Sequence, residues 1–467
     1  MEMDIVIIGG GPGGYVAAIR AAQLGAKVCL IEKDKLGGTC LNSGCIPTKA
    51  LYRNAEILNT LKSIDEFGIS ISGYEINIST IQERKNKIVD QLVFGVEKLL
   101  KANKIEVVKG IAQVIDSNTV LVNEGEESFK EIKAKKIIIA TGSKPSIPPI
   151  PGAELEGIYT SEDILNFKEI PKKLTVIGGG VIGMEFAGIF NAMGTEVTVV
   201  EFLPTILVQV DTDLTKRLIP SLKKKGISIH TSTKVMSIEK NDGNFIVNCE
   251  GKKGKVSFDS DAVLISTGRA PVVDEERYAA LGIEVTRKGI KVDANMETSL
   301  KDVYAIGDVN GISMLAHTAS HQGINVVEHL MGINRGTQGT VIPSCIFIFP
   351  EISCAGVSED EAKAKGIDYL TSKFLFGANG KALALGESEG MIKIIAKKED
   401  NTIIGVHIMG PHASDLIHEG VIAIEKKLTP DDIGHIIHAH PTLSESFVEA
   451  VLGIKGEAIH LAPTLKK

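Results

Sequence analysis

The sequence predicts an α/β protein with two Rossmann-like nucleotide-binding domains and a separate α+β domain at its C-terminal end. Residues 1–34 read as strand, glycine turn, helix and strand, which is how a βαβ unit begins. Residues 173–201 repeat that order. After Ile342 the pattern changes to short strands and helices with frequent glycines. The chain has 467 residues, which is enough for roughly three or four domains.

Composition and charge narrow the class of protein. Hydrophobic residues make up 43% of the chain and charged residues 23%, as in ordinary folded proteins. The net charge of -7, without a long run of Lys or Arg, argues against nucleic acid or an anionic membrane as a partner. The apolar run Ile5–Ile8 is too short for a membrane span or an export signal, so we expect a cytoplasmic protein. Six cysteines in so long a chain do not form a disulfide scaffold, and any disulfide should serve chemistry.

The first βαβ unit carries a dinucleotide fingerprint. Gly9, Gly11 and Gly14 form GxGxxG between a strand and a helix, and Glu32 ends the next strand. The glycines allow the backbone to approach a pyrophosphate at the helix N-terminus, and the acid accepts a hydrogen bond from a ribose hydroxyl. GxGxxG alone is a weak signal, but this context makes it specific.

The second βαβ unit repeats the fingerprint with Gly178, Gly180, Gly183 and Glu201. Two dinucleotides are therefore expected. A carboxylate at Glu201 would repel a 2′-phosphate, and residues 202–210 contain no Lys or Arg to receive one. The second site is thus predicted to prefer NAD over NADP.

Two cysteines lie close together in GGTCLNSGCIPTKAL, residues 37–51. Between Cys40 and Cys45 a regular helix would rise about 7.5 Å, too far for a disulfide. A bridge therefore requires Cys40 on a turn that leads into the helix. Pro47 suits the first turn of that helix, so Cys45 is expected near a helix N-terminus, where a thiolate is stabilised. The layout favours a redox pair over two unrelated thiols or a metal site.

A candidate base lies near the C-terminus, in HAHPTLSESF. Thiol–disulfide exchange needs a group that takes and returns a proton, and the imidazole of His440 has a suitable pKa. Glu445 can orient the ring and stabilise the imidazolium. Because a histidine before a proline is often structural, the assignment depends on its surroundings.

Together these segments resemble the pyridine nucleotide-disulfide oxidoreductases over essentially the whole chain. The motifs in that family's order and spacing are the two fingerprints, the Cys-x4-Cys segment, ATG at 140–142, STGRAP at 266–271, VYAIGDV at 303–309 and HAHPTLSE at 438–445. Within the family, GGTCLNSGCIPTKAL is more similar to the enzymes that oxidise dihydrolipoyl groups than to the glutathione reductases.

The resemblance implies FAD in the first site and NAD in the second. The residues implied to hold FAD are Gly9, Gly11, Gly14, Glu32, Lys49, Thr141, Gly142, Asp308 and Ala316. The residues implied to hold NAD are Gly178, Gly180, Gly183, Glu201 and Gly268. No metal is expected.

The resemblance also implies catalytic roles. Cys45 is similar to the thiol that faces the flavin, and Cys40 to the thiol that exchanges with substrate. Lys49 and Glu185 match an ion pair beside the flavin, although both could be solvated helix charges. His440 and Glu445 match a base and its orienting acid, which in the family come from the other subunit of a homodimer. A cis bond is expected between His440 and Pro441.

The expected domains are an FAD-binding domain at 1–147 and 272–341, an NAD-binding domain at 148–271 and a C-terminal interface domain at 342–467. A helical stretch is expected from about Pro47 to Lys104. The segment AHTASHQG, residues 316–323, departs from the family because it lacks the usual Lys and Glu. His317 and His321 have helical spacing, but packing or solvation is favoured over metal binding.

These features predict an NAD-dependent flavoenzyme that oxidises dihydrolipoyl groups. Its partner would be the lipoyl domain of a 2-oxoacid dehydrogenase or related complex, or a glycine-cleavage carrier protein. The alternatives are a reductase of glutathione, another disulfide or mercuric ion, and a flavin-bound redox sensor or assembly protein.

Overall fold

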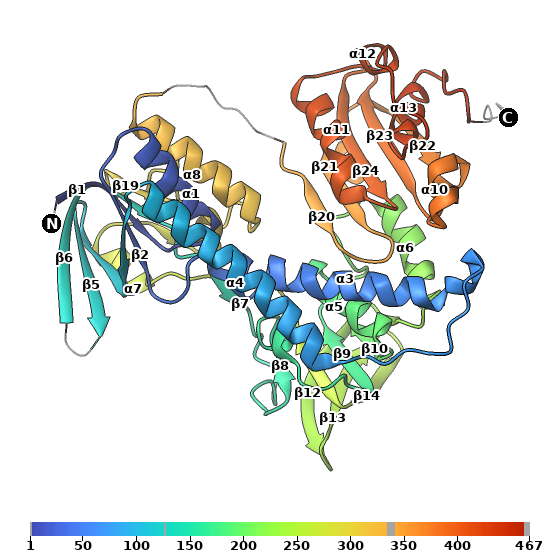
Figure 1. Cartoon of the computed structure of the whole chain (residues 1–467), viewed down its shortest axis with the longest axis horizontal. Coiled ribbons are helices and arrows are strands. Elements are labelled where there is room, and N and C mark those ends of the chain that lie inside the picture. The colour runs from blue at the N-terminus through green and yellow to red at the C-terminus, as the bar shows by residue number, and fades with distance from the viewer. Residues whose placement is uncertain (1, 126–127, 334–340, 462–467) are drawn as a thin grey trace.

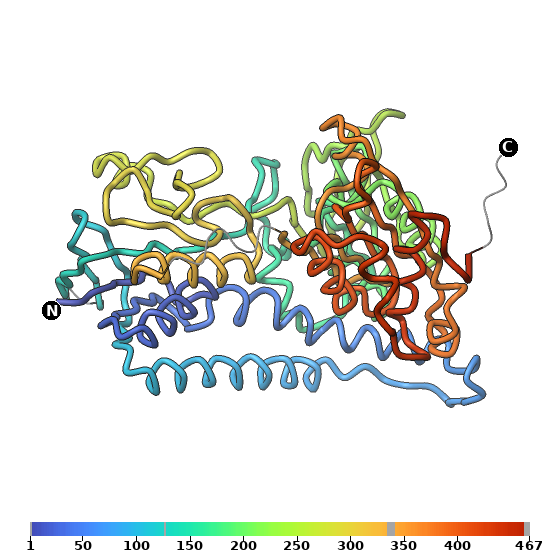
Figure 2. Tube along the Cα trace, turned by 90° about the horizontal axis from the view of Figure 1, so that it is seen from above, coloured from blue at the N-terminus to red at the C-terminus, as the bar shows by residue number. Residues whose placement is uncertain are grey.

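The computed structural model describes residues 2–125, 128–333 and 341–461. Parts of two predicted domains, at residues 1, 126–127, 334–340 and 462–467, lie outside these residues. The chain forms three α/β lobes in an elongated arrangement, with the N- and C-terminal ends at opposite sides (Figure 1, Figure 2). The predicted fold class is confirmed.

The first lobe contains a largely parallel sheet. Its strands run in the order β3 (Glu106–Lys109), β2 (Val28–Glu32), β1 (Glu2–Ile8), β6 (Ser128–Ile139), β5 (Thr119–Gly125) and β4 (Ile111–Asp116), and β19 (Val303–Ala305) pairs with β6. Helix α1 (Pro12–Gln23) packs against α8 (Ala316–Leu330), and Arg20 bonds Glu328 at 2.5 Å between them. Residues beyond 300 therefore return to the N-terminal sheet.

Helices connect this sheet to the rest of the molecule. They are α2 (Gly38–Asn42), α3 (Cys45–Lys62) and α4 (Ile78–Ala102), with a 3-10 turn, η1, at Ile64–Phe67. The helical stretch expected from about Pro47 to Lys104 is mostly helical but is interrupted, because residues 68–77 form no helix. Gly68 and Gly73 both take positive φ there, which ends a helix readily. Helix α4 then runs beside α3 (Figure 1).

The second lobe repeats the parallel arrangement. Its sheet runs β11 (Ser228–His230), β10 (Glu196–Val200), β9 (Lys173–Ile177), β15 (Ala262–Ile265) and β8 (Ile158–Tyr159). The accompanying elements are α5 (Val181–Ala192), α6 (Thr212–Lys224), η2 (Asp163–Asn166) and the antiparallel strands β12 (Thr233–Asn241), β13 (Asn244–Gly251) and β14 (Gly254–Ser260). Two short strands, β7 (Ser143–Pro145) and β16 (Arg269–Pro271), pair where the chain enters and leaves this lobe.

The third lobe is an antiparallel sheet with helices. Its strands run β20 (Ser344–Ile346), β21 (Ile352–Gly356), β24 (Ile403–Met409), β23 (Met391–Lys397) and β22 (Tyr369–Leu375). Its helices are α9 (Glu359–Ala364), α10 (Gly380–Leu385), α11 (Ala413–Glu425), α12 (Pro430–Gly434) and α13 (Glu445–Leu452), with η4 at Phe376–Ala378. The remaining elements, α7 (Glu275–Ala280), β17 (Val285–Thr286), β18 (Gly289–Ile290) and η3 (Gly307–Asn310), belong to the first lobe. Within the described residues, no helix is both long and apolar enough to cross a bilayer.

Candidate active site

The cysteine pair lies where the first lobe meets the long helices. Cys45 is the first residue of α3, as predicted from Pro47. Cys40 lies in the short helix α2 rather than on a simple turn, which corrects the expectation for this residue. Ser43 and Gly44 separate the two helices. Because the chain turns between the two helices, the side chains of Cys40 and Cys45 face each other. Both are free thiols, and they share a hydrogen bond.

The two thiols are electrostatically unequal. The hydrogen bond from Cys40, and then the ammonium of Lys49, lower the pKa of Cys45 to about 7 against the opposing effect of burial. The same hydrogen bond, together with burial, raises the pKa of Cys40. In the dithiol form Cys45 is therefore the more acidic thiol, and Cys40 is the one that keeps its proton.

Lys49 joins two lobes beside Cys45. Its ammonium lies 3.0 Å and 2.9 Å from the two carboxylate oxygens of Glu185, which projects from α5. It also lies 4.4 Å from the ring centre of Phe347, whose backbone N–H donates to Glu185 at 3.0 Å. Glu185 is buried, so this ion pair is not a pair of solvated helix charges. Three segments of the chain thus fix a cation next to the reactive thiol.

The first fingerprint has the geometry of a pyrophosphate site. A Cβ added to Gly14 would lie 1.8 Å from the carbonyl oxygen of Gly9, so only glycine fits. Glu32 accepts from Gly10 N at 2.6 Å and Asp34 N at 2.8 Å, which places its carboxylate at the end of β2. Both features fit the adenosine and pyrophosphate of a dinucleotide.

The other residues implied to hold FAD come from separate segments. Thr141 donates to Val272 O at 2.8 Å, and Gly142 comes next with φ 72°. Ala316 begins α8. Asp308 accepts a hydrogen bond from Ser143 Oγ. Their positions around the first fingerprint fit the binding of FAD.

Sequence reasoning missed Arg269, which ties the site together. Its guanidinium donates to Ser143 Oγ at 2.7 Å, to Glu162 at 3.1 Å and to Thr39 at 3.5 Å. Arg269 therefore links Ser143, the partner of Asp308, to the residue before Cys40. The sequence shows that Arg269 belongs to the STGRAP motif. It does not show which residues Arg269 contacts, because they lie far away along the chain.

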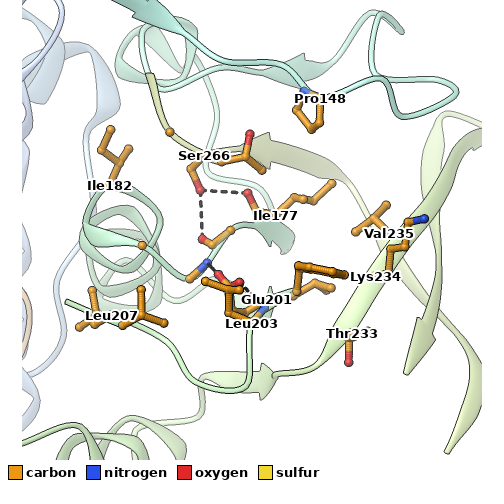
Figure 3. Close-up of a pocket in the computed structure, with 18 of the residues that line it drawn as sticks. Pro148, Ile177, Ile182, Glu201, Leu203, Leu207, Thr233, Lys234, Val235 and Ser266 are labelled. Carbon is orange, nitrogen blue, oxygen red and sulfur yellow. Dashed lines mark hydrogen bonds between the residues drawn. The ribbon is translucent and has the colours of Figure 1, made fainter. Parts of the chain in front are cut away.

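The second fingerprint borders a cavity of about 710 Å³, a size suited to a nucleotide (Figure 3). A Cβ on Gly183 would lie 2.1 Å from Gly178 O. Glu201 accepts from Gly179 N and Leu203 N, each at 2.6 Å. The lining also includes Gly180, Gly268 and Ser266. The residues present fit NAD.

One lysine that sequence reasoning did not consider is among the residues that line the cavity. Lys234, on β12, lines it opposite the fingerprint turn (Figure 3). The lining therefore includes a lysine, although residues 202–210 contain none. Lys234 lies 33 positions after Glu201, so only the packing of β12 brings it there.

The candidate base and its acid are joined as expected. His440 Nδ1 and Glu445 Oε1 lie 2.8 Å apart, and Thr442 N donates to Glu445 Oε2 at 2.8 Å. The hydrogen bond from Thr442, and then that from His440, lower the pKa of Glu445. The predicted cis bond between His440 and Pro441 is confirmed. A second cis bond, Phe349–Pro350, was not expected.

The structure does not bring His440 to the thiols within one protomer. The ends of α12 and α13, which flank His440, lie apart from the start of α3 (Figure 1). The side chain of His440 is 80% exposed, and Ile437 nearby is 97% exposed. An exposed imidazole beside exposed apolar surface is the arrangement expected at an interface.

His317 and His321 have other partners. His317 bonds Pro343 O at 2.9 Å, and His321 Nδ1 accepts from Asn325 at 3.0 Å. Both contacts are those of packed or solvated helix residues.

Comparison with known proteins identifies similar sequences over the whole chain. The profile of the pyridine nucleotide-disulphide oxidoreductases matches residues 3–323, and that of the family's dimerisation domain matches residues 342–451. A dihydrolipoyl dehydrogenase of Bacillus subtilis is 42% identical over 98% of this chain and 99% of its own. One from Geobacillus stearothermophilus is 42% identical over 99% of this chain and 98% of its own. The mitochondrial dihydrolipoyl dehydrogenase of Pisum sativum is 40% identical over 98% of this chain and 93% of its own.

Solved structures show the same architecture. The Cu(II) complex of a HOCl-induced flavoprotein disulfide reductase from Escherichia coli superimposes with a TM-score of 0.87. It is 28% identical and covers 97% of this chain and 99% of its own.

Proposed function

Because this chain belongs to the pyridine nucleotide-disulphide oxidoreductase family, we propose that it oxidises dihydrolipoyl groups and passes the electrons to NAD. The route would run through Cys40, Cys45 and FAD. Relatives at 40–42% identity that span nearly the whole chain support this activity over other disulfide substrates.

The observation that carries the proposal is the inequality of the two thiols. In the exchange step a substrate thiolate attacks the sulfur of Cys40, the Cys40–Cys45 bond breaks, and Cys45 leaves as the thiolate. The second substrate thiolate then displaces Cys40, which gives the oxidised lipoyl disulfide and the enzyme dithiol. A leaving thiolate needs a low pKa, and Cys45 has one of about 7. Cys40 ends protonated, as the donor of the hydrogen bond to Cys45.

His440 supplies proton transfer in this scheme. The ring accepts a proton from the substrate dithiol through Nε2, and Glu445 stabilises the imidazolium through Nδ1. Since His440 lies apart from Cys45 in one protomer, we assign it to the site of the partner subunit. The match to a dimerisation domain supports the homodimer that this requires.

Bound FAD and NAD supply the hydride chemistry that amino acids lack. The first fingerprint, with Glu32, Thr141, Gly142, Asp308 and Ala316, would hold FAD. The second, with Glu201 and Gly268, would hold NAD. Lys49 and Glu185 would orient the flavin beside Cys45.

We further propose that the three lobes are the functional domains, with boundaries at 147/148, 271/272 and 341/342. The separate sheets support this division. A lipoyl domain of a 2-oxoacid dehydrogenase complex, or a glycine-cleavage carrier protein, would deliver the substrate, in the cytoplasm.

The experiment that tests the function is anaerobic reduction of NAD by dihydrolipoamide, with NADP in parallel and bound flavin measured first. We expect rapid turnover with NAD and little with NADP. A flavin-loaded protein that fails with dihydrolipoamide would move the substrate to another disulfide and leave the exchange chemistry of Cys40 and Cys45 in place.

A further inference from the structure

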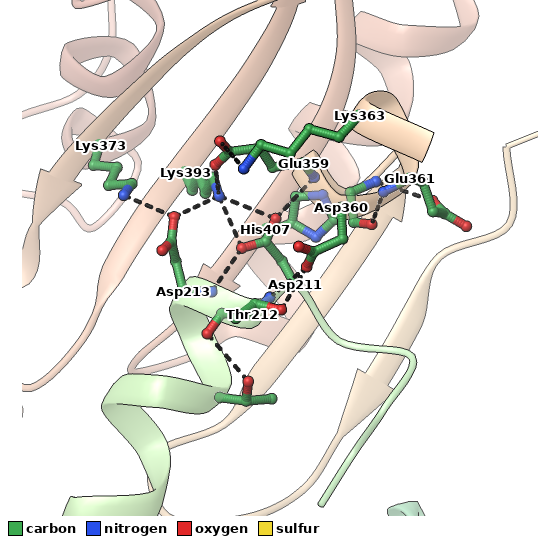
Figure 4. A network of polar contacts seen from close by, with 12 residues as sticks. Asp211, Thr212, Asp213, Glu359, Asp360, Glu361, Lys363, Lys373, Lys393 and His407 are labelled. Carbon is green, nitrogen blue, oxygen red and sulfur yellow. Dashed lines mark hydrogen bonds and ion pairs between the residues drawn. The ribbon is translucent and has the colours of Figure 1, made fainter. Parts of the chain in front are cut away.

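A buried lysine joins the NAD-binding lobe to the C-terminal lobe. Lys393, on β23, has 0% exposure, and its ammonium contacts Asp211 at 2.8 Å, Asp213 at 2.6 Å and Glu359 at 2.6 Å (Figure 4). The two aspartates stand at the start of α6 in one lobe, and Glu359 opens α9 in the other. A buried ammonium is stable only when it is paired and hydrogen-bonded, and these carboxylates provide both.

Outer lysines balance the charge of this cluster. Lys373 contacts Asp213 at 2.7 Å, and Lys363 contacts Glu359 at 2.9 Å. Three acids and three lysines therefore meet where the two lobes join. Burial alone would raise the pKa of Asp213, yet the hydrogen bonds from Lys373 and Lys393 hold it at about 2.

The same cluster caps two helices reciprocally. Asp211 accepts from Asp213 N at 3.0 Å in its own helix and from Glu359 N at 2.9 Å in α9. In return, Asp360 of α9 accepts from Thr212 N at 3.1 Å and Thr212 Oγ1 at 2.6 Å. Helix N-termini carry positive partial charge, so these two ends and Lys393 would repel one another without the acids. The junction is therefore specified in both distance and orientation.

Asp211 also ends the loop that forms one wall of the NAD cavity. Residues 202–210 run from Glu201 to Asp211, and Leu203, Leu207 and Val208 line the cavity. Leu207 has φ 49°, a left-handed conformation that is costly for a residue with a side chain. The N–H of Leu207 donates to Gly179 O at 2.9 Å, and this hydrogen bond holds the loop against the fingerprint turn. Burial of Leu207 and of its neighbours Ile206 and Val210 helps to hold this conformation, and Asp211 fixes the end of the loop that follows.

We propose that Lys393 is a positioning residue for NAD: by fixing Asp211 against the C-terminal lobe, it sets the loop 202–210 that closes the NAD cavity. This inference rests on the proposed NAD site. It adds that a residue in the C-terminal lobe, Lys393, influences the affinity of that site for NAD. The affinity for NAD then depends on the position of the C-terminal lobe relative to the NAD-binding lobe.

Lys393→Met tests the proposal because it keeps the volume and removes the charge. In the flavin-loaded full-length protein, the Kd for NAD measured by calorimetry should rise by roughly 2- to 30-fold, the range of coupling through packed networks. The rate of flavin reduction by dihydrolipoamide without NAD should stay unchanged. A residue that merely stabilised the fold would lower the active fraction in both measurements and leave the Kd for NAD as it was.

Lys225→Met is the matched control. Lys225 joins the opposite end of α6 to the same lobe, through Phe349 O at 2.7 Å, but does not hold the loop 202–210. It should leave the Kd for NAD unchanged. An equal rise in both variants would overturn the proposal, because any loosening of the two lobes would then suffice.

Asp360→Ala is a second variant that tests the proposal if Lys393→Met does not fold. Asp360 is exposed, and its loss removes the cross-lobe cap on Thr212 without stranding a buried charge. We expect a smaller rise in the Kd for NAD, roughly 2- to 5-fold. An unchanged Kd in Asp360→Ala and in any folded Lys393→Met overturns the inference while leaving the proposed function intact. Absence of NAD binding by the unaltered protein would instead refute the proposed function.

Discussion

The two glycine-rich units are alike in a loop that lies beyond their fingerprints. After Glu32 the chain turns back so that Gly37 N donates to Gly10 O at 2.8 Å. After Glu201 it does the same, and Leu207 N donates to Gly179 O at 2.9 Å. Gly37 and Leu207 both have positive φ, 91° and 49°. The backbone of the two units therefore matches through the second strand and into the loop.

Beyond that loop the two units differ. In the first unit the loop leads directly to Cys40 and Cys45, and a Cβ on Gly38 would lie only 2.7 Å from Gly11 Cα. In the second unit it leads to Asp211 and the junction with Lys393. Apart from the neighbouring chain itself, no described atom lies within 4 Å of where a Cβ on Gly180 would stand. At this glycine the first unit is covered by its own redox segment, whereas the second unit is not.

The largest expected effect is a loss of turnover that involves the loop of the first unit and not that of the second. Cys45→Ser should abolish NAD reduction by dihydrolipoamide, because the leaving thiolate is lost. Flavin content and the Kd for NAD should not change, since the second unit is untouched. Cys249→Ala, at a buried cysteine on β13, is the control and should keep its turnover. Loss of flavin in Cys45→Ser would show that the redox segment closes the first unit rather than only carrying its chemistry.

The base lies in neither unit, which hybrid dimers can demonstrate. His440→Gln should lower turnover by about 10²- to 10⁴-fold. Mixing it with Cys45→Ser after subunit exchange should restore activity, because one of the two sites then contains both Cys45 and His440. Unrestored activity in mixtures proven to contain hybrids would place His440 in its own protomer's site.

A matched pair of glycine substitutions tests whether the two fingerprints act independently. Gly14→Ala should yield protein without flavin, because the new Cβ would clash at 1.8 Å with Gly9 O. Gly183→Ala should keep its flavin and lose NAD affinity by at least about tenfold, the equivalent of roughly 1.4 kcal/mol of local strain. Absorbance spectra and NAD titrations measure the two effects. Flavin loss in both variants would mean that the units fold as one.

The smallest expected effect concerns Lys49, the cation near Cys45 in the first unit. The Cys45 thiol, with a pKa of about 7, is a thiolate above that pH and protonated below it. Lys49→Met removes one cause of the low pKa and should shift the iodoacetamide alkylation profile of the reduced protein to higher pH. The rate at pH 7 should fall roughly threefold. Lys62→Met, at the far end of α3, should leave the profile where it is. An unshifted profile in Lys49→Met would assign the low pKa to Cys40 alone.

Local features were predictable from sequence. The fingerprints, Glu32, Glu201 and the positions of Cys45, His440 and Glu445 depend on contacts within a βαβ unit or a few residues of chain. Spacing and periodicity encode such contacts directly. The break in the long helical stretch carried a local signal too, in Gly68 and Gly73, that the helical pattern on either side obscured.

The pairing of distant segments was decided by the tertiary structure. Lys49 and Glu185 are 136 positions apart, and Lys393 and Asp211 are 182 apart. Lys234 lines the NAD cavity and Arg269 reaches Thr39 only because whole strands pack there. Residue type and spacing say nothing about which charges become neighbours across a domain boundary, since that depends on how complete sheets and helices fit together. The sequence alone therefore specified the two nucleotide folds and the cysteine pair, while packing determined which charges lie beside them.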